Sequence, residues 1–358
     1  MKQLDWHWQL FAHDTLFMLG FTARQPASTG HAIHSGAIVI ALLAALLLAV
    51  STISAAAQPD RWRSEGWTTD FSKSTIDFAT VMSGGPPKDG IPPIDDPVFL
   101  PVTEASGLDD KEPVMSVVIN GAARAYPLRI MIWHEIVNDT LAGQPISVTY
   151  CPLCNAAIVF GRTVEGAVTS FGTTGKLRNS DLVMYDRETE SWWQQFTGEA
   201  ITGSRTGTKL EVIPSRLESW QVFSTRHPDG EVLAPNNAGL RDYGRNPYAG
   251  YDSSSVPFLY RGAMPEGIAP LSYVVVVREA SEPLAVSLDK LRRDNAVTLD
   301  GFEFTWVPGV RSALDTSSIA QGREIGSVTV TRDGVDVAHE LTFAFVIGAF
   351  LPQTVIVQ

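Results

Sequence analysis

The chain has 358 residues, and its 27 Lys and Arg against 39 Asp and Glu give a formal net charge of −12. This acidic balance disfavours general nucleic-acid binding, and a hydrophobic content of 44% supplies a large core, which excludes a wholly disordered chain. The chain has only two cysteines, so a scaffold held together by several disulfides is excluded as well.

The N-terminal region has the pattern of an export signal. Residues 37–50 form an uncharged apolar run, and Ala55 and Ala57 provide a small-residue cleavage pattern. We expect residues 1–57 to be a signal peptide with an atypical N-terminal extension, or a signal anchor if residues 36–57 stay uncut. Both alternatives predict an exported protein, periplasmic or otherwise extracytoplasmic, whose membrane contact runs only through this segment.

The rest of the chain is predicted to be mostly strands. Residues 58–95 are rich in Pro, Gly and Asp, which is typical of a linker or of a segment that wraps around a core. Residues 96–358 are interpreted as a single domain. Within it, two β runs flank Asn120-Gly121, a strong hairpin signal, and further turns are expected at Glu165-Gly166 and Asp333-Gly334.

Helical periodicity is confined to three short stretches, at Leu128–Asn138, Arg216–Arg226 and Leu284–Asn295. Short helices between many strands predict a β-dominated α+β fold.

The domain also contains a weak internal similarity. Thr149–Cys154 aligns with Thr305–Val310, with Thr, an aromatic residue and Pro at matching places. This similarity predicts two related β-rich units, near residues 112–175 and 272–350, that arose by internal duplication. Residues 176–271 would then be a long, loop-rich connection that packs across the units.

The strongest chemical signal is the pair Cys151 and Cys154 in the string CPLC. Two thiols at this spacing can close a disulfide or bind one soft metal ion, because both project from one tight turn. The aligned turn of the second unit has Val307 and Val310 at these places, which favours a functional role for the thiols. A static disulfide and two inert buried thiols remain the structural alternatives.

A metal ion would need further ligands, and His134 is the best candidate. It lies in IMIWHEIVND, upstream of the strand that leads to the cysteines, so strand pairing would bring it near their turn. Two thiolates and one imidazole suit copper before zinc. The leading hypothesis is therefore a soft-metal site made of Cys151, Cys154 and His134, whereas His134 as an ordinary buried histidine is the alternative. Glu135 beside it is a weaker candidate for a general acid or base.

Two other functions stay open. The protein could be a thiol–disulfide oxidoreductase, with Cys151 and Cys154 as catalytic residues acting on a redox partner protein, which requires a lowered thiol pKa. It could also be a non-enzymatic module that binds a small ligand or a protein in a cleft around Trp192, Trp193 and the loop Arg241–Tyr251. The common nucleotide-binding and hydrolase motifs do not occur, and the sequence leaves open whether the protein is an enzyme.

A polar string from Arg178 to Arg187, which includes Asp181 and Asp186, is followed closely by Trp193. Such mixtures of charged and aromatic residues line small-molecule pockets, so Asp186, Arg187 and Trp193 are candidate pocket residues. The alternative is that the charged residues form an exposed turn and the tryptophan lies in the core.

Several strings together resemble the domain-of-unknown-function 3179 family: AYPL, WHEIVND, TYCPLC, LVMYDR and SWWQ. The resemblance covers roughly residues 90 to 352. It implies an exported or membrane-anchored bacterial or archaeal protein, and it implies no established activity. The motif positions that it highlights are His134, Cys151, Cys154, Asp186, Arg187 and Trp193. The chain has Asn-Ala after CPLC, where Gly-Ser or a similar pair is common in the family.

Overall fold

The structure, a computed structural model, describes residues 58–358. The expected export signal over residues 1–57 lies outside the described residues. Within 58–358, no helix is both long enough and apolar enough to cross a membrane.

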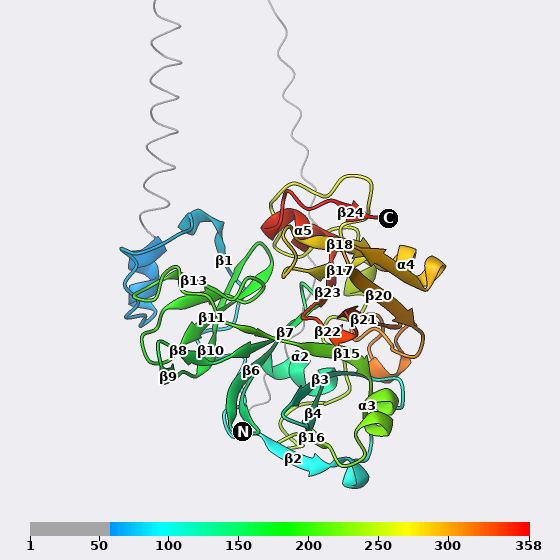
Figure 1. The fold of residues 1–358 in the computed structure, drawn as a ribbon. Coiled ribbons are helices and arrows are strands. Elements are labelled where there is room, and N and C mark those ends of the chain that lie inside the picture. The colour runs from blue at the N-terminus through cyan, green and yellow to red at the C-terminus, as the bar shows by residue number, and fades with distance from the viewer. Residues whose placement is uncertain (1–57) are drawn as a thin grey trace, which may run out of the picture. The chain divides into compact units, whose positions relative to one another are not determined.

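The fold is a propeller-like ring of five small sheets (Figure 1), which confirms the prediction of a β-dominated chain with short helices. Most neighbouring strands run antiparallel. Sheet I is formed, in spatial order, by β1 (Val81–Ser83), β10 (Phe171–Arg178), β11 (Asp181–Asp186), β12 (Trp192–Gln194) and β13 (Glu199–Thr202).

Sheets II and III follow. Sheet II is formed by β14 (Val212–Ile213), β7 (Ala156–Gly161), β6 (Gln144–Cys151) and β5 (Ile136–Leu141). Sheet III is formed by β15 (Ser215–Ser219), β3 (Pro113–Ile119), β4 (Ala122–Pro127), β16 (Glu231–Ala234) and β2 (Val98–Pro101).

Sheets IV and V complete the ring. Sheet IV is formed by β19 (Ala296–Leu299), β20 (Phe302–Val307), β21 (Ser327–Arg332) and β22 (Val335–Asp336). Sheet V is formed by β23 (Glu340–Phe343), β17 (Tyr273–Val277), β18 (Leu284–Ser287) and β24 (Ile356–Val357). A separate hairpin is formed by β8 (Thr163–Val164) and β9 (Ala167–Val168).

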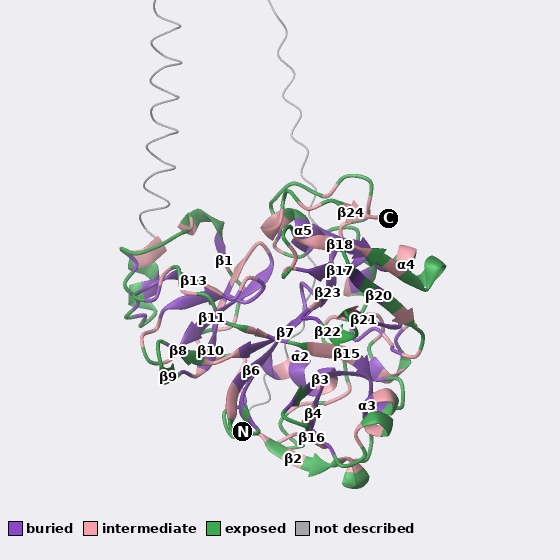
Figure 2. Ribbon diagram, viewed as in Figure 1, coloured by how far each residue is buried: buried purple, intermediate pink, exposed green. Residues whose placement is uncertain are grey.

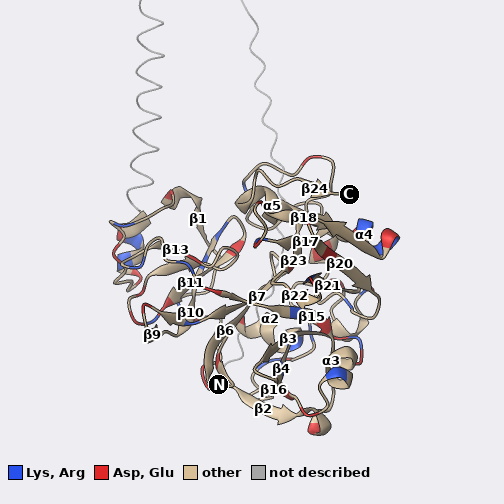
Figure 3. Cartoon of the chain, in the orientation of Figure 1, with Lys and Arg blue, Asp and Glu red and all other residues tan. Residues whose placement is uncertain are grey.

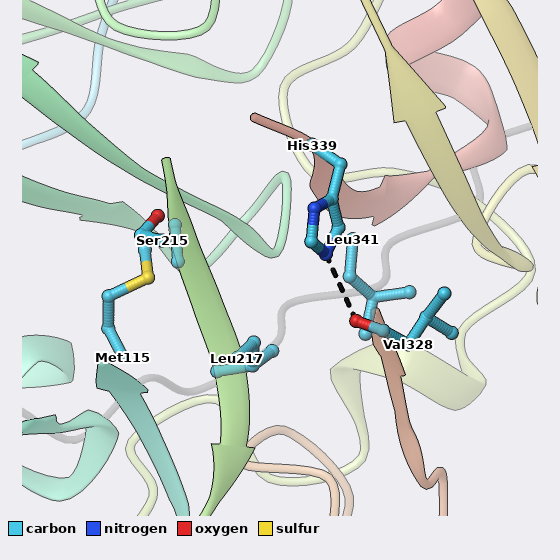
Figure 4. A pocket seen from close by; sticks show the side chains of 7 residues that line it. Met115, Ser215, Leu217, Val328, His339 and Leu341 are labelled. Atoms are coloured by element: carbon cyan, nitrogen blue, oxygen red, sulfur yellow. Dashed lines mark hydrogen bonds between the residues drawn. The ribbon is translucent and has the colours of Figure 1, made fainter. Parts of the chain in front are cut away.

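Strands of sheets II to V surround a small cavity of about 10 Å³ (Figure 4), which is room for roughly one water molecule. The strands that meet here are largely buried (Figure 2), and β7 among them carries no charged residue (Figure 3). The ring is therefore closed by packed side chains and has no open channel at this point. The cavity is lined by Met115, Ala157, Ser215, Leu217, Val328, His339 and Leu341.

The predicted turns are confirmed. Asn120 and Gly121 between β3 and β4 have φ values of 49° and 82°, and Asp333 and Gly334 between β21 and β22 have 52° and 77°. Two successive positive φ values are what a type I′ hairpin requires, and Asn-Gly and Asp-Gly adopt them at low cost. Glu165-Gly166 likewise joins β8 to β9.

Each predicted helical stretch contains a helix of seven residues, shorter than expected. These are α2 (Leu128–His134), α3 (Trp220–Arg226) and α4 (Leu288–Asp294). The rest of each predicted stretch is mostly strand, in β5, β15 and β18. The side chains of Ser219 and Ser287 accept hydrogen bonds from Val222 N and Lys290 N, respectively. These two serines are therefore N-cap residues that stabilise the start of each helix directly after a strand. Two helices of the described residues were not predicted: α5 (Ala344–Phe350) and a short helix at residues 58–64.

The segment 176–271 differs from the expected loop-rich connection. Up to Ala234 more than half of it is regular structure, because β11 to β16 and α3 lie in it, and only residues 235–272 are largely irregular. Short 3₁₀ turns occur here and elsewhere, at Phe78–Thr80, Val102–Glu104, Tyr251–Ser253 and Ile319–Gln321.

Sheets III and V have the same internal pairing. In sheet III, β15, β3 and β4 pair antiparallel and β16 joins β4 in parallel; in sheet V, β23, β17 and β18 pair antiparallel and β24 joins β18 in parallel. Each second hairpin strand leads into a helix and then a three-stranded meander, β5–β6–β7 or β19–β20–β21.

Most of residues 58–95 pack against sheet I, whereas Ile94 near their end forms a parallel bridge with Val137 of sheet II. Their Val81–Ser83 strand, β1, pairs with β10 at the sheet edge. Trp62, Trp67 and Phe71 surround Trp192 with ring centroids 4.7, 5.1 and 5.2 Å away. This part of the chain therefore wraps the sheet and forms a second, aromatic core.

Candidate metal centre

The two cysteines lie at the junction of β6 and β7. Cys151 is the last residue of β6, and Cys154 is in the turn that leads to Ala156, where Cys154 N donates to Cys151 O at 3.3 Å. Sheet V holds this turn, because Thr342 Oγ1 and Phe343 N both donate to Cys154 O. Both thiols are free, with residue exposures of 2% and 0%.

A carboxylate completes a three-residue group with these thiols. The two sulfurs and one carboxylate oxygen of Asp181 all lie within 4.8 Å of one another. Asp181 is the first residue of β11, directly after the Asn179–Ser180 turn, whose residues have φ values of 52° and 67°. Cys151 Sγ lies 3.8 Å from Ser180 O, so the thiol pair of sheet II abuts this turn of sheet I.

The Asp181 carboxylate is fully buried and only half satisfied. Its Oδ2 accepts hydrogen bonds from Gln194 Nε2 at 2.6 Å and from Phe196 N at 2.9 Å. Its Oδ1 has no hydrogen-bond partner. A buried polar oxygen without a partner is costly, so it marks a place where another group is expected.

Burial dominates the electrostatics of the group. It raises the pKa of Asp181 to about 6, raises that of the Cys151 thiol, and raises that of the Cys154 thiol well above its usual value. No Lys or Arg within the described part of the chain forms an ion pair with Asp181. The thiols are therefore protonated near neutral pH, and a cation would favour their ionised forms.

Glu135 is a second buried carboxylate near this group. It follows α2 with a φ of 60° and is 7% exposed, and burial, followed by the charge of Asp181, raises its pKa to about 8. Its environment within residues 58–358 consists of apolar burial and the charge of Asp181, with no hydrogen-bond donor or ion-pair partner. From the sequence, Glu135 was expected only as a weaker candidate for a general acid or base.

His134 does not belong to the thiol group, so the predicted ligand set needs correction. Its Nδ1 donates to Pro92 O at 2.7 Å, and its Nε2 accepts from the Tyr243 hydroxyl at 2.8 Å. Burial lowers its pKa, consistent with a neutral ring. Both ring nitrogens are occupied, and Asp181 takes the third place that was expected for His134.

Asp186, Arg187 and Trp193 do not line a common pocket in the described structure. Trp193 Nε1 donates to Asp186 Oδ2 at 2.8 Å, and Asp186 Oδ1 accepts from Thr189 N at 2.7 Å; both Trp193 and Asp186 are fully buried. Arg187 instead pairs with Asp95 at 2.6 Å. These residues hold the turn between β11 and β12.

The predicted cleft around the tryptophans is also wrong, since Trp192 and Trp193 are both fully buried. The loop 241–251 does border a hollow of about 600 Å³ that is open to solvent. Its walls are polar and come from α2, this loop and a later one: Arg129, Asp242, Tyr243, Gly244, Arg245, Ser317 and Ser318.

The same irregular segment, 235–272, covers the cysteine turn. The Tyr251 hydroxyl donates to Leu153 O at 3.0 Å and accepts from Phe258 N at 3.2 Å. Ser180 Oγ donates to Phe258 O, which ties the cover to the turn before Asp181. This arrangement keeps water away from the thiols.

Sequence reasoning missed Asp181 as a ligand, although it lay within the polar string. The only local signal was its position after a turn and at the start of a strand. Its proximity to the cysteines depends on how sheets I and II pack, which no spacing in the sequence encodes.

Comparison with known proteins gives a family and no further relative. No curated protein matches the chain, and no solved structure does. The model of the family described as "Protein of unknown function (DUF3179)" matches residues 88–354, which include the cysteine turn, Glu135 and Asp181. The chain therefore belongs to the DUF3179 family.

Proposed function

We propose that this protein binds one soft metal ion through Cys151, Cys154 and Asp181, outside the cytoplasm. One observation carries the proposal: the buried Asp181 carboxylate places an oxygen within 4.8 Å of both sulfurs, and its Oδ1 has no hydrogen-bond partner among the described residues. An ion bound here would satisfy this oxygen and stabilise both thiolates. The location outside the cytoplasm rests on the export pattern of residues 1–57.

Zinc is the preferred ion, with copper second. A preference for copper would require an imidazole beside the thiols, and His134 is hydrogen-bonded to Pro92 and Tyr243 instead. Thiolates suit both Cu(I) and zinc, whereas a carboxylate is a common zinc ligand and a poor match for Cu(I). Replacing the imidazole by a carboxylate therefore shifts the choice of ion.

The redox alternative is less favoured by this environment. An attacking cysteine needs an accessible thiol with a substantial thiolate fraction. Cys151 and Cys154 are buried, and burial raises the pKa of both. A partner protein could reach the thiols only after the covering segment moved.

Metal titration of the reduced full-length chain under anaerobic conditions tests the proposal. We expect one Zn(II) per chain, with Cu(I) as the second ion tried, and a large loss of affinity in Cys151→Ser and Asp181→Asn. A free zinc concentration of 100 times Kd should raise the free energy of unfolding by about 2.7 kcal/mol. Equally weak binding by wild type and Cys151→Ser would contradict the proposal.

A second candidate is the binding of a small polar ligand in the hollow beside Tyr243. The side chains of Arg245, Ser317 and Ser318 line it and make no hydrogen bond or ion pair with other described residues. This function predicts that Cys151→Ser/Cys154→Ser rescues a gene deletion as well as wild type does, whereas substitution of Arg245 does not.

We also infer that the two β-rich units arose by internal duplication. The matching pairing of sheets III and V, and the equal order of elements that follows in each, support this. Only the first unit has a thiol pair. Comparison of the two units therefore distinguishes residues that both need for folding from residues, such as the cysteines, that only one unit has and that can serve metal binding.

A further inference from the structure

Glu135 occupies a backbone position next to the cysteine strand. Its N–H donates to Met131 O at 2.7 Å and ends α2, and its carbonyl accepts from Tyr150 N at 2.8 Å. Tyr150 directly precedes Cys151, and β5 begins at the residue after Glu135. The backbone of Glu135 is therefore fixed beside the last residues of β6.

The second unit repeats this junction with a different residue. Asn295 ends α4 with a φ of 62°, donates to Leu291 O at 2.8 Å, and accepts from Trp306 N at 2.8 Å. Asparagine tolerates the left-handed region better than most residues, whereas glutamate there is unfavourable. The fold can therefore build this junction without a carboxylate.

The two cysteines, like Glu135, have residues of another type at the equivalent positions of the second unit. Cys151 and Cys154 correspond to Val307 and Val310, since Tyr150 and Trp306 make the equivalent backbone hydrogen bond. Glu135 and both cysteines thus replace non-ligand residues at equivalent places of one unit only. These three residues, which differ from their counterparts in the second unit, all lie near the buried carboxylate of Asp181. Their location indicates a shared role in binding one ligand.

We propose that Glu135 is the fourth protein ligand of the metal centre, so that the ion is held by two sulfurs and two carboxylates. This inference rests on the proposed function. The Glu135 carboxylate lies outside the group whose atoms are within 4.8 Å of one another, so the side chain must turn toward the ion. This movement breaks no hydrogen bond with residues 58–358, because none of them donates to the Glu135 carboxylate.

The charge of such a centre is reasonable for zinc. Two thiolates and two carboxylates around a divalent ion carry the same formal charge as a closed four-cysteine zinc site. Four protein ligands also leave no open position for a substrate, which makes the site structural or storage-like. Two carboxylates further disfavour Cu(I), which prefers sulfur and imidazole.

The test compares Glu135→Asn with the mirror-image variant Asn295→Glu in the full-length chain. Glu135→Asn installs the residue that the second unit tolerates at this φ, so the fold should survive, and Glu135→Gln serves as an isosteric second variant. Zinc affinity is measured by competition with a chromogenic chelator. The geometry is followed by the visible absorption of Co(II), which is strong for four-coordinate sites and weak for higher coordination.

We expect Glu135→Asn and Glu135→Gln to lose at least about tenfold in zinc affinity and to weaken the Co(II) absorption, with Asn295→Glu unchanged. Wild-type affinity and Co(II) absorption in both Glu135 variants, together with lost binding in Cys151→Ser, would overturn this inference and leave the proposed function standing. Equal weak binding by wild type and Cys151→Ser would overturn both.

Discussion

Gln194 Nε2 donates a 2.6 Å hydrogen bond to Asp181 Oδ2, while Oδ1 of the same carboxylate, which lies beside the two thiols, keeps no partner among the described residues. Gln194 lies on β12 and Asp181 on the neighbouring strand β11, so sheet I orients the carboxylate. The thiols come from sheet II. The candidate centre therefore depends on contacts between two sheets as well as on its own residues.

Gln194→Ala should weaken zinc binding without removing a ligand. Asp181 Oδ2 would keep only Phe196 N as a partner, so the carboxylate would lose orientation, and we expect a roughly 10-fold to 100-fold loss of affinity. The measurement is chelator competition, with the exposed Gln221→Ala as the control. Unchanged affinity would mean that Phe196 N alone holds the carboxylate.

Trp193→Phe should affect stability and leave metal binding intact. The change removes the 2.8 Å hydrogen bond to Asp186, and a lost hydrogen bond to a charged group costs about 1.5 to 3 kcal/mol. Urea unfolding measures this loss, and zinc titration should give an affinity within about twofold of wild type. A large drop in affinity with an unchanged free energy of unfolding would return Trp193 to the candidate site.

Trp192→Ala should loosen the wrapping segment. Trp192 is fully buried among Trp62, Trp67 and Phe71, and truncation of such a residue costs about 3 to 5 kcal/mol. We expect faster proteolysis of residues 58–95 and a lower unfolding midpoint. Val335→Ala, at a side chain whose residue is 67% exposed, is the control and should stay within about 0.5 kcal/mol of wild type.

The pair Arg216–Asp336 predicts a pH-dependent contribution to stability. It joins β15 of sheet III to β22 of sheet IV. Burial acts to raise the pKa of Asp336, but the hydrogen bond and charge of Arg216 outweigh it and lower that pKa. Its contribution is therefore present above the unfolded pKa of about 3.9 and is lost as pH falls through the lower folded value.

Asp336→Asn should thus destabilise the protein near pH 7, and the difference from wild type should shrink below about pH 3. Because the Asp336 side chain is 41% exposed, solvent screening limits the effect to roughly 0.5 to 1 kcal/mol. Denaturant unfolding at both pH values measures it. A difference that is equal at pH 7 and pH 3 would assign the loss to packing instead of charge.

Much of the fold could be predicted from local patterns. Asn120-Gly121 and Asp333-Gly334 specify their turns through the φ values that these residues tolerate, and Ser219 and Ser287 mark where strands become helices. The proximity of the two thiols could be predicted in the same way, because both cysteines lie in one turn. These features depend on neighbours within a few residues.

The ligand set could not be predicted in this way. The ring of His134 is hydrogen-bonded to Pro92 and Tyr243 and does not reach the thiols. The next residue in the sequence, Glu135, is the one that lies near Asp181. The direction of each side chain is set at the junction of α2 and β5 by a left-handed residue. The spacing of hydrophobic residues along the sequence does not indicate a single residue with a positive φ, such as Glu135.

Composition and local patterns are enough to predict an acidic, strand-rich protein with one close pair of thiols. That Asp181, and not His134, lies beside these thiols becomes known only from the folded chain. The reason is physical: turn and strand preferences act between near neighbours, whereas the meeting of Asp181 with Cys151 and Cys154 follows from how two whole sheets pack.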